Sequence, residues 1–255
     1  MIKYARVKRM DKKVVLVTGS SSGLGSEIIR KFASNNYNCI INYLTHENEA
    51  KSLKKELESK YKIKCLIVKA DISNENEVLK MKELILKEFS KIDVLVNNAG
   101  IAIDTPLDMK TKQNFMRTLE VNLYSTFLVS KTFGDIMFEN KNGKIINISS
   151  TNGIDTYYEF SIDYDASKAG VINLTHNLAN HYAPYINVNC VCPGWIDTPM
   201  NKELSQDFRK EETSKILLNR FAEPQEIASL VYFLSTKEAS YINDSIIRID
   251  GGKKC

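Results

Sequence analysis

The sequence predicts a single α/β domain, a doubly wound fold in which helices cover both faces of one parallel sheet. Short apolar, β-branched runs alternate with helical patterns along the whole chain. A length of 255 residues with 43% hydrophobic residues is enough to bury one large core. No Pro/Gly-rich linker divides the chain, so we expect one domain over residues 12–255.

The expected elements follow one another as βαβ units, which give a parallel sheet. Seven strand-like runs lie at 14–18, 38–43, 63–69, 92–97, 143–149, 185–191 and 245–249. Helical patterns between them lie at about 23–35, 47–60, 74–89, 111–139, 164–182 and 224–235. The sheet does not need the segment at about 195–220, which we expect to form an insertion of short helices.

The formal net charge of +4 comes largely from the first residues of the chain. We expect residues 1–11 to be a disordered basic arm, with either Met1 or Met10 as the natural start. An RNA tether is the alternative for this arm, but the near-neutral remainder gives no electrostatic case for a nucleic-acid partner. No apolar run approaches the ~18 residues of a membrane helix.

Five cysteines and three histidines show no metal-ligand spacing, so we expect no catalytic metal. Cys39, Cys65 and Cys190 lie in expected core strands, where cysteine acts as a small hydrophobic residue. An odd number of thiols without a secretion signal favours a cytoplasmic location.

A glycine-rich turn joins the first strand to the first helix. Strand, glycine-rich turn and helix in this order are the context of a dinucleotide-binding motif, in which the backbone approaches a pyrophosphate over the helix N-terminus. The spacing departs from G-x-G-x-x-G by extra residues between the first two glycines, and a flexible loop without a ligand is the alternative. The expected contacts are Gly19, Ser21, Ser22, Gly23, Leu24 and Gly25.

Tyr164 and Lys168 lie one turn apart on one face of an expected helix. Tyrosine ionises near pH ~10, but a buried ammonium one turn away stabilises the phenolate and lowers that pKa. The pair therefore predicts an acid-base group that works near pH ~7. Taken alone, the same spacing also occurs on solvated helix faces.

Several motifs together resemble the short-chain dehydrogenase/reductase family, in the family's order and over almost the whole chain. They are Thr18-Gly19-x-x-x-Gly23-x-Gly25, Asn97-Asn98-Ala99-Gly100, Asn122, a serine ending Ile145-Ile146-Asn147-Ile148-Ser149-Ser150, Tyr164-x-x-x-Lys168 and Pro193-Gly194. The resemblance implies a Rossmann fold and hydride transfer between NAD(P)(H) and a carbonyl or secondary alcohol.

The resemblance also implies the catalytic roles. Tyr164 would exchange a proton with the substrate oxygen, and Lys168 would bond the nicotinamide ribose. Ser150 would orient the substrate oxygen, and Asn122 would hold a water that links Lys168 to solvent. Ser149 stays an alternative to Ser150, because neighbouring residues of a strand face opposite ways.

The remaining cofactor contacts are likewise implied by the resemblance. The adenine would be bound at Asp71 and Ile72, although Asp71 also reads as a helix cap before Asn74. The contacts to the riboses and the nicotinamide would be Asn97, Ala99, Gly100, Tyr164, Lys168, Pro193, Gly194, Ile196 and Thr198, with Asn97 also tying neighbouring strands together.

The second strand ends without the aspartate that an NAD enzyme of this family usually carries there. We therefore favour NADP, with Asn42, Thr45 and His46 as partners of a 2′-phosphate that bind it without a full charge. The arginine that often binds this phosphate is missing, since the relevant positions hold Ser22 and Leu44, so the use of NAD stays open.

The resemblance points to 3-oxoacyl-acyl-carrier-protein reductases or to glucose and sugar-alcohol dehydrogenases. An aromatic-rich substrate wall, capped by residues 195–220, suits an apolar ketone, a thioester or a sugar, and its expected members are Ile103, Thr105, Tyr157, Tyr158, Phe160, Trp195 and Met200. The neighbouring helices are poor in arginine and predict no dock for an acidic carrier.

We therefore expect NADPH-dependent reduction of a 3-oxoacyl thioester or similar ketone. A sugar or polyol dehydrogenase is the alternative, and a non-catalytic NADP-binding regulatory protein is opposed by the intact Asn122, Ser150, Tyr164 and Lys168. The family also implies a homodimer or homotetramer, formed through helices 111–139 and 164–182.

Overall fold

The computed structural model describes residues 12–201 and 204–253 and contains one parallel seven-stranded sheet of order β3-β2-β1-β4-β5-β6-β7. Its strands are β1 Val14–Val17, β2 Asn38–Tyr43, β3 Cys65–Lys69, β4 Val94–Asn97, β5 Gly143–Ile148, β6 Ile186–Pro193 and β7 Ile246–Ile249. The predicted fold class and all seven predicted strands are confirmed.

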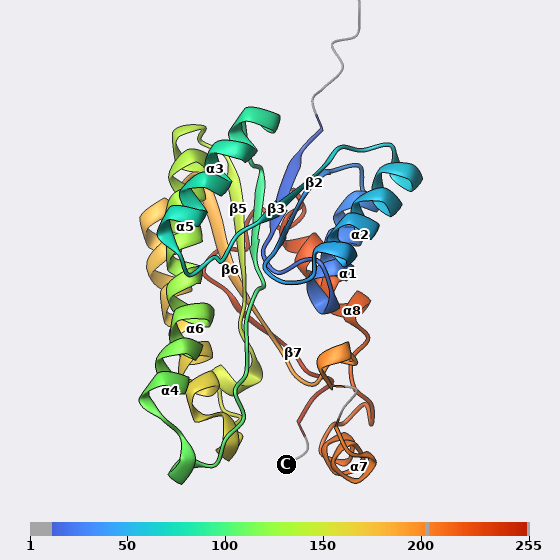
Figure 1. The fold of residues 1–255 in the computed structure, drawn as a ribbon, viewed down its shortest axis with the longest axis vertical. Coiled ribbons are helices and arrows are strands. Elements are labelled where there is room, and N and C mark those ends of the chain that lie inside the picture. The colour runs from blue at the N-terminus through green and yellow to red at the C-terminus, as the bar shows by residue number, and fades with distance from the viewer. Residues whose placement is uncertain (1–11, 202–203, 254–255) are drawn as a thin grey trace, which may run out of the picture.

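Helices cover both faces of this sheet (Figure 1). One face carries α1 Gly23–Ser34, α2 Glu47–Tyr61 and α8 Pro224–Leu234, and the other carries α3 Glu75–Phe89, α4 Lys112–Leu119, α5 Ser125–Glu139 and α6 Ile162–Tyr182. The interior strand β1 contributes to both layers, because its side chains alternate between the faces. Val15 and Val17 pack into the core under α1, while Val14 and Leu16 pack into the core under α5.

The helix predicted over 111–139 is present, but a π-helical turn, Glu120–Tyr124, separates α4 from α5. A π-turn inserts an extra residue into a helical ladder, and such turns frequently mark functional sites. Here the turn carries the buried Asn122.

The expected insertion at 195–220 contains a 3-10 turn, Pro199–Asn201, and helix α7 Gln206–Ser214. Further 3-10 turns, Leu107–Met109, Thr151–Gly153 and Glu159–Ser161, lie in the loops that follow β4 and β5. In Figure 1 these segments gather at the same end of the molecule as α4 and α7. This end holds the carboxyl ends of the strands, where doubly wound sheets bind their ligands.

The predicted basic arm at 1–11 and the choice between Met1 and Met10 lie outside the described residues. Within the described ranges, no helix is long and apolar enough to cross a membrane, and no three potential metal-ligating side chains come together. Cys39, Cys65, Cys190 and Cys192 are buried free thiols.

Candidate active site

The glycine-rich loop is packed so tightly that two of its glycines have no room for a side chain. Gly19 has a positive φ of 61°, and a Cβ placed on it would lie 2.9 Å from the Cβ of Ala99. A Cβ on Gly25 would lie 2.5 Å from the carbonyl oxygen of Gly19. The loop therefore has one compact conformation that brings its backbone to the end of β4.

Helix α1 begins at this loop with backbone N–H groups that are suited to an anion. Its first turn carries no acidic residue, and the exposed Ser22 at the N-cap makes no side-chain hydrogen bond to the helix. A free helix N-terminus of this kind attracts phosphate. Beside it, a hollow of about 250 Å³ lies between Gly23 and Ser26 of α1 and Asp197 of the capping segment.

The other predicted loop contacts, Ser21 and Leu24, are a buried hydroxyl and a half-buried side chain of the same turn. The side chain of Asn42, near the end of β2, holds the glycine-rich loop in place through a hydrogen bond. Its Oδ1 accepts from the Gly19 N–H at 3.1 Å, and its Nδ2 donates to the carbonyl of Ala70 at 3.1 Å. Both ends of this amide are thus engaged within the protein.

The exposed polar groups just beyond β2 are Thr45 and His46, whose side chains hydrogen-bond to each other at 3.1 Å. Of the predicted partners of a 2′-phosphate, Thr45 and His46 are exposed and can face a ligand, whereas Asn42 is buried.

Asp71 follows β3, as predicted, but its carboxylate already has partners. It accepts from the backbone and hydroxyl of Ser73, at 2.9 and 2.6 Å, and pairs with Arg117 of α4 at 3.2 Å. Burial acts to raise the pKa of Asp71, but these partners outweigh it and lower the pKa. The cap of α3 is Asn74, which accepts from the Glu77 N–H, so Asp71 is not the helix cap. Ile72 beside it is buried.

Asn97 ends β4 and ties this strand to its neighbours, as the sequence predicts. Its Nδ2 donates to Asn147 of β5 and to Ser130 of α5, both at 2.8 Å. The following Ala99 is held by its N–H, which donates to the Thr18 hydroxyl of the glycine-rich loop at 3.1 Å. The loops after β1 and β4 are therefore locked together.

Gly100 lies between Asn122 and Lys168. A Cβ at this position would lie 3.2 Å from Asn122 Oδ1 and 3.5 Å from Lys168 Nζ. The side chain of Asn122 accepts from the Ile101 N–H at 2.8 Å and donates to the Ser167 hydroxyl at 3.0 Å. The π-turn thus fixes the loop after β4 to helix α6.

Tyr164 and Lys168 of α6 face each other, with the Lys168 ammonium 5.4 Å from the centre of the tyrosine ring. The Lys168 Nζ donates to the carbonyl of Ile148 at 2.9 Å. Burial lowers the pKa of Lys168 to about 8.

The structure differs from the prediction that Lys168 lowers the pKa of Tyr164. Burial raises the pKa of Tyr164 to about 12, and a hydrogen bond with Ser150 offsets only part of this effect. Removing water from around the hydroxyl penalises the phenolate directly. At neutral pH the Tyr164 hydroxyl keeps its proton, so this arrangement can donate a proton to a bound carbonyl oxygen.

The geometry brings Ser150, rather than Ser149, to the tyrosine. Ser149 is buried and donates its hydroxyl proton to the backbone carbonyl of Lys168 at 2.7 Å. Ser150, at the start of the 3-10 turn Thr151–Gly153, lies close enough to Tyr164 for its hydroxyl to lower the pKa of the tyrosine. Residues Asn122, Ser150, Tyr164 and Lys168 therefore meet at the carboxyl end of the sheet.

The segment after β6 approaches the glycine-rich loop. Pro193 is the last residue of β6, and the Gly194 N–H donates to the carbonyl of Ile249 at 3.0 Å. Ile196 pairs with Ala222 in a short bridge, and its carbonyl accepts from the N–H of the buried Thr198 at 2.9 Å. These contacts hold the predicted nicotinamide-binding segment in place.

Aromatic rings link the loop before α6 to the capping segment. The ring of Tyr158 lies 5.3 Å from Phe160 and 6.1 Å from Phe208 of α7. Phe208 contacts Trp195 at 5.6 Å, and Trp195 stacks on Phe221 at 5.5 Å. Phe208 and Phe221 were not among the predicted wall residues, because only the folded cap brings them to Trp195.

The other predicted wall residues differ in placement. The Thr105 N–H donates to the carbonyl of Phe160 at 2.9 Å, and the carbonyl of Ile103 accepts from Lys110. Tyr157 is 87% exposed. The side chain of Met200 lies outside the part of the chain that the structure describes.

Sequence reasoning missed the polar groups that surround Tyr164. Its neighbours Asp163 and Asp165 are bonded to Lys110 and Asn152, at 2.9 and 2.7 Å. Two acids beside a candidate proton donor indicate that polar partners lie near Tyr164, but nothing in the sequence identifies those partners.

Comparison with known proteins places the chain in a family. The model of the short chain dehydrogenases matches residues 13–209. The chain is 37% identical over 245 residues to the 3-oxoacyl-(acyl-carrier-protein) reductase FabG of Aquifex aeolicus, with 96% of this chain and 98% of that protein covered. It is 36% identical over 246 residues to the enzyme of the same name from Thermotoga maritima, with the same coverage of 96% and 98%.

Among solved structures, a 3-oxoacyl-(acyl-carrier protein) reductase from Brucella melitensis superimposes with a TM-score of 0.89 at 27% identity, covering 95% of this chain and 91% of that one. The chain belongs to the short-chain dehydrogenase family, whose members are oxidoreductases that bind NAD(P) and act on carbonyl or hydroxyl groups of small molecules.

Proposed function

We propose that this short-chain dehydrogenase uses NADPH to reduce a 3-oxoacyl thioester, or a ketone of similar shape, to the corresponding hydroxy compound. The observation that carries the proposal is the meeting of Asn122, Ser150, Tyr164 and Lys168 at the carboxyl end of the sheet, with the Lys168 ammonium 5.4 Å from the centre of the Tyr164 ring. Two relatives that carry the name of such a reductase, at 37% and 36% identity over nearly their whole length, support the substrate class.

In the proposed reaction the bound dihydronicotinamide supplies a hydride to the carbonyl carbon. When the carbonyl binds, the Ser150 hydroxyl turns its proton from Asn152 Oδ1 to the carbonyl oxygen and holds that oxygen next to Tyr164. The Tyr164 hydroxyl then gives its proton to that oxygen as negative charge develops there. Lys168, with a pKa of about 8, lies close enough to stabilise the phenolate, and Asn122 connects this group to the loop after β4.

We propose NADP as the preferred cofactor, with NAD as the alternative. The end of β2 has no acidic residue that would repel a 2′-phosphate, and the exposed Thr45 and His46 can hydrogen-bond it. The N-terminus of α1 would hold the pyrophosphate, as Gly19 and Gly25 allow the backbone to approach it.

The test is the oxidation of NADPH and NADH, followed at 340 nm, against 3-oxoacyl thioesters, small ketones and sugars. We expect turnover of thioesters with NADPH, and a loss of kcat of at least about 10³-fold in Tyr164→Phe with nearly unchanged NADPH binding. Activity that survives in Tyr164→Phe would refute the proposed proton donor.

The same panel separates the alternatives. Oxidation of glucose or a sugar alcohol, without thioester reduction, would indicate a sugar or polyol dehydrogenase. Tight NADPH binding without any turnover would indicate a non-catalytic binding protein.

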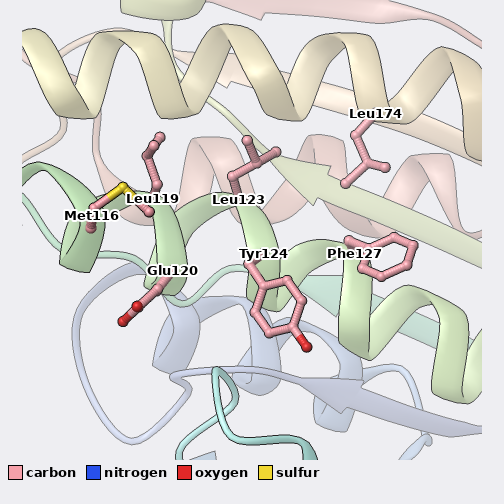
Figure 2. Close-up of a pocket in the computed structure, with 7 residues that line it drawn as sticks. All are labelled: Met116, Leu119, Glu120, Leu123, Tyr124, Phe127 and Leu174. Atoms are coloured by element: carbon pink, nitrogen blue, oxygen red, sulfur yellow. The ribbon is translucent and has the colours of Figure 1, made fainter.

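We further propose that the chain forms a homodimer or homotetramer in the cytoplasm, as a single domain over residues 12–255. An apolar groove of about 460 Å³ runs along α4, the π-turn and α5, against α6. Figure 2 shows its lining, Met116, Leu119, Glu120, Leu123, Tyr124, Phe127 and Leu174. Three of these large side chains, Met116, Tyr124 and Phe127, are more than 40% exposed, as expected for a subunit interface.

The oligomer proposal is tested by light scattering with Phe127→Asp. A buried charge at a subunit contact is costly, so we expect the substituted protein to elute as a monomer. A matched charge on an exposed surface elsewhere, Leu79→Asp on α3, should leave the oligomer intact. An unsubstituted protein that is itself monomeric would refute the proposal.

A further inference from the structure

An unbroken chain of hydrogen bonds joins the residue after Tyr164 to Ser150. Asp165 Oδ1 accepts from Asn152 Nδ2 at 2.7 Å. Asn152 Oδ1 accepts from the Ser150 hydroxyl at 3.3 Å, and the Asn152 backbone N–H donates to the same Ser150 oxygen at 3.2 Å. The chain starts at a carboxylate and ends at the Ser150 hydroxyl beside Tyr164.

The chemistry of the three groups gives this chain a direction. A carboxylate only accepts hydrogen bonds, so Asp165 pairs with the NH₂ end of the Asn152 amide and leaves its oxygen end facing Ser150. The Ser150 hydroxyl proton then has a fixed acceptor, and its oxygen a fixed donor. Without the carboxylate, the amide could turn over and present NH₂ to Ser150, which would remove the side-chain acceptor and loosen the position of the serine hydroxyl.

The second oxygen of the same carboxylate holds the substrate wall. Asp165 Oδ2 accepts from the backbone N–H of Tyr158 at 3.0 Å. Tyr158 in turn contacts Phe160 and Phe208 of the aromatic wall. One half-buried side chain is therefore bonded both to the turn that carries Ser150 and to the wall of the expected substrate site.

We propose that Asp165 and Asn152 are positioning residues: Asp165 fixes the amide of Asn152, Asn152 holds the Ser150 oxygen beside Tyr164 so that its proton can turn from Asn152 to a bound substrate oxygen, and Asp165 also fixes Tyr158 in the wall. The inference rests on the proposed function, in which Ser150 holds the carbonyl. Neither residue touches the substrate in this scheme. Both act through a neighbour, so their effects should depend on that neighbour being present.

The first test compares steady-state kinetics of Asn152→Ala, Ser150→Ala and the double variant on the best substrate of the carbonyl panel. We expect Asn152→Ala to lower kcat by about tenfold or more, with KM changed by less than about threefold, because a displaced hydroxyl weakens transition-state stabilisation. In the Ser150→Ala background, adding Asn152→Ala should change kcat by less than about twofold.

The two carboxylate oxygens of Asp165, one bonded to Asn152 and the other to Tyr158, give a second expectation. Asp165→Ala should lower kcat about as much as Asn152→Ala does and should also raise KM by about threefold or more, since the Tyr158 segment is released. Asp165→Asn keeps the shape of the side chain and should act in the same direction if the alanine variant does not fold. The control is Asn177→Ala, an exposed asparagine of α6 whose side-chain bonds, among the described residues, stay within its own helix, at Asn173.

A measurement independent of turnover examines the hydrogen bond itself. The side-chain NH₂ resonance of Asn152, identified by its loss in Asn152→Ala, should exchange slowly with water in the unsubstituted protein and rapidly in Asp165→Ala. Rapid exchange in the unsubstituted protein would overturn the inference, even where no substrate has been found.

The kinetic outcomes distinguish this inference from the proposed function. A protein that reduces no thioester refutes the function, whereas thioester turnover with an unchanged kcat in Asn152→Ala refutes only the positioning roles. An equal loss of kcat with and without the Ser150 hydroxyl would also overturn the inference, because it would show a general structural effect.

Discussion

Lys110→Met should destabilise the protein strongly, because Lys110 neutralises a fully buried carboxylate. The Asp163 side chain is 0% exposed and that of Lys110 is 4% exposed. The Lys110 ammonium donates to Asp163 at 2.9 Å and to the backbone carbonyls of Ile103 at 2.5 Å and Phe160 at 3.2 Å. Removing one partner of a buried pair costs about 3–5 kcal/mol, and we expect a loss of about 4 kcal/mol here.

The double variant Lys110→Met/Asp163→Asn tests whether the loss comes from the stranded charge. It removes both charges and leaves an amide that can still bond the Thr118 hydroxyl, now paired with Asp163 at 2.8 Å. We expect it to lose only about 1–2 kcal/mol, about 2–3 kcal/mol less than Lys110→Met alone loses. Urea unfolding followed by circular dichroism, at one fixed protein concentration, measures all the variants.

Lys112→Met, an exposed neighbour on the same segment, is the control and should change the free energy of unfolding by less than about 0.5 kcal/mol. A loss below about 1 kcal/mol in Lys110→Met, which is typical of a surface ion pair, would refute the reasoning.

Two further predictions concern catalysis and cofactor binding. Lys168, with a pKa of about 8, carries its charge below that pH and loses it above. We therefore expect kcat/KM for reduction to fall as the pH rises through about 8. A profile that stays flat to about pH 9.5 would contradict this expectation. Gly25→Ala should weaken NADPH binding by at least about tenfold, because the new Cβ would lie 2.5 Å from the Gly19 carbonyl oxygen and distort the phosphate-binding loop. Calorimetric titration measures the Kd of NADPH. An unchanged Kd would show that the loop adapts to the added methyl group.

The sheet could be predicted because each buried strand is a short apolar run, and the alternation with helices leaves few topologies. The π-turn could not be predicted in the same way. Residues 111–139 carry a continuous helical pattern, and a single extra residue in the ladder hardly changes that pattern. What sets the turn apart is the pairing of buried Asn122 with Ile101 and Ser167, which only the folded chain brings together.

The ionisation of Tyr164 shows a second limit of sequence reasoning. The sequence places an ammonium one turn away from Tyr164, and this proximity argues for a lowered pKa. It cannot say how much water the fold removes from the hydroxyl. In the structure the loss of water around the hydroxyl raises the pKa of Tyr164 to about 12, which favours the protonated form that a reductase needs.

The acids on either side of Tyr164 connect these observations. In the sequence, Asp163 and Asp165 are ordinary acids in the first turn of a helix, where they complement its dipole. Residues two apart on a helix point in different directions, so the two carboxylates reach different partners. Asp163 is bonded to Lys110, 53 residues earlier in the chain, and Asp165 to Asn152, 13 residues earlier.

The first turn of α6 therefore binds two segments of the site, the loop after β4 and the segment after β5, to the helix that carries the proton donor. The Asp163 arm holds the loop after β4 through a buried charge, so its loss should appear chiefly as reduced stability. The Asp165 arm is half-buried and bonds groups next to the reacting centre, so its loss should appear chiefly in kcat and KM. If the two acids showed the same balance of effects, the separation of the two arms would be wrong.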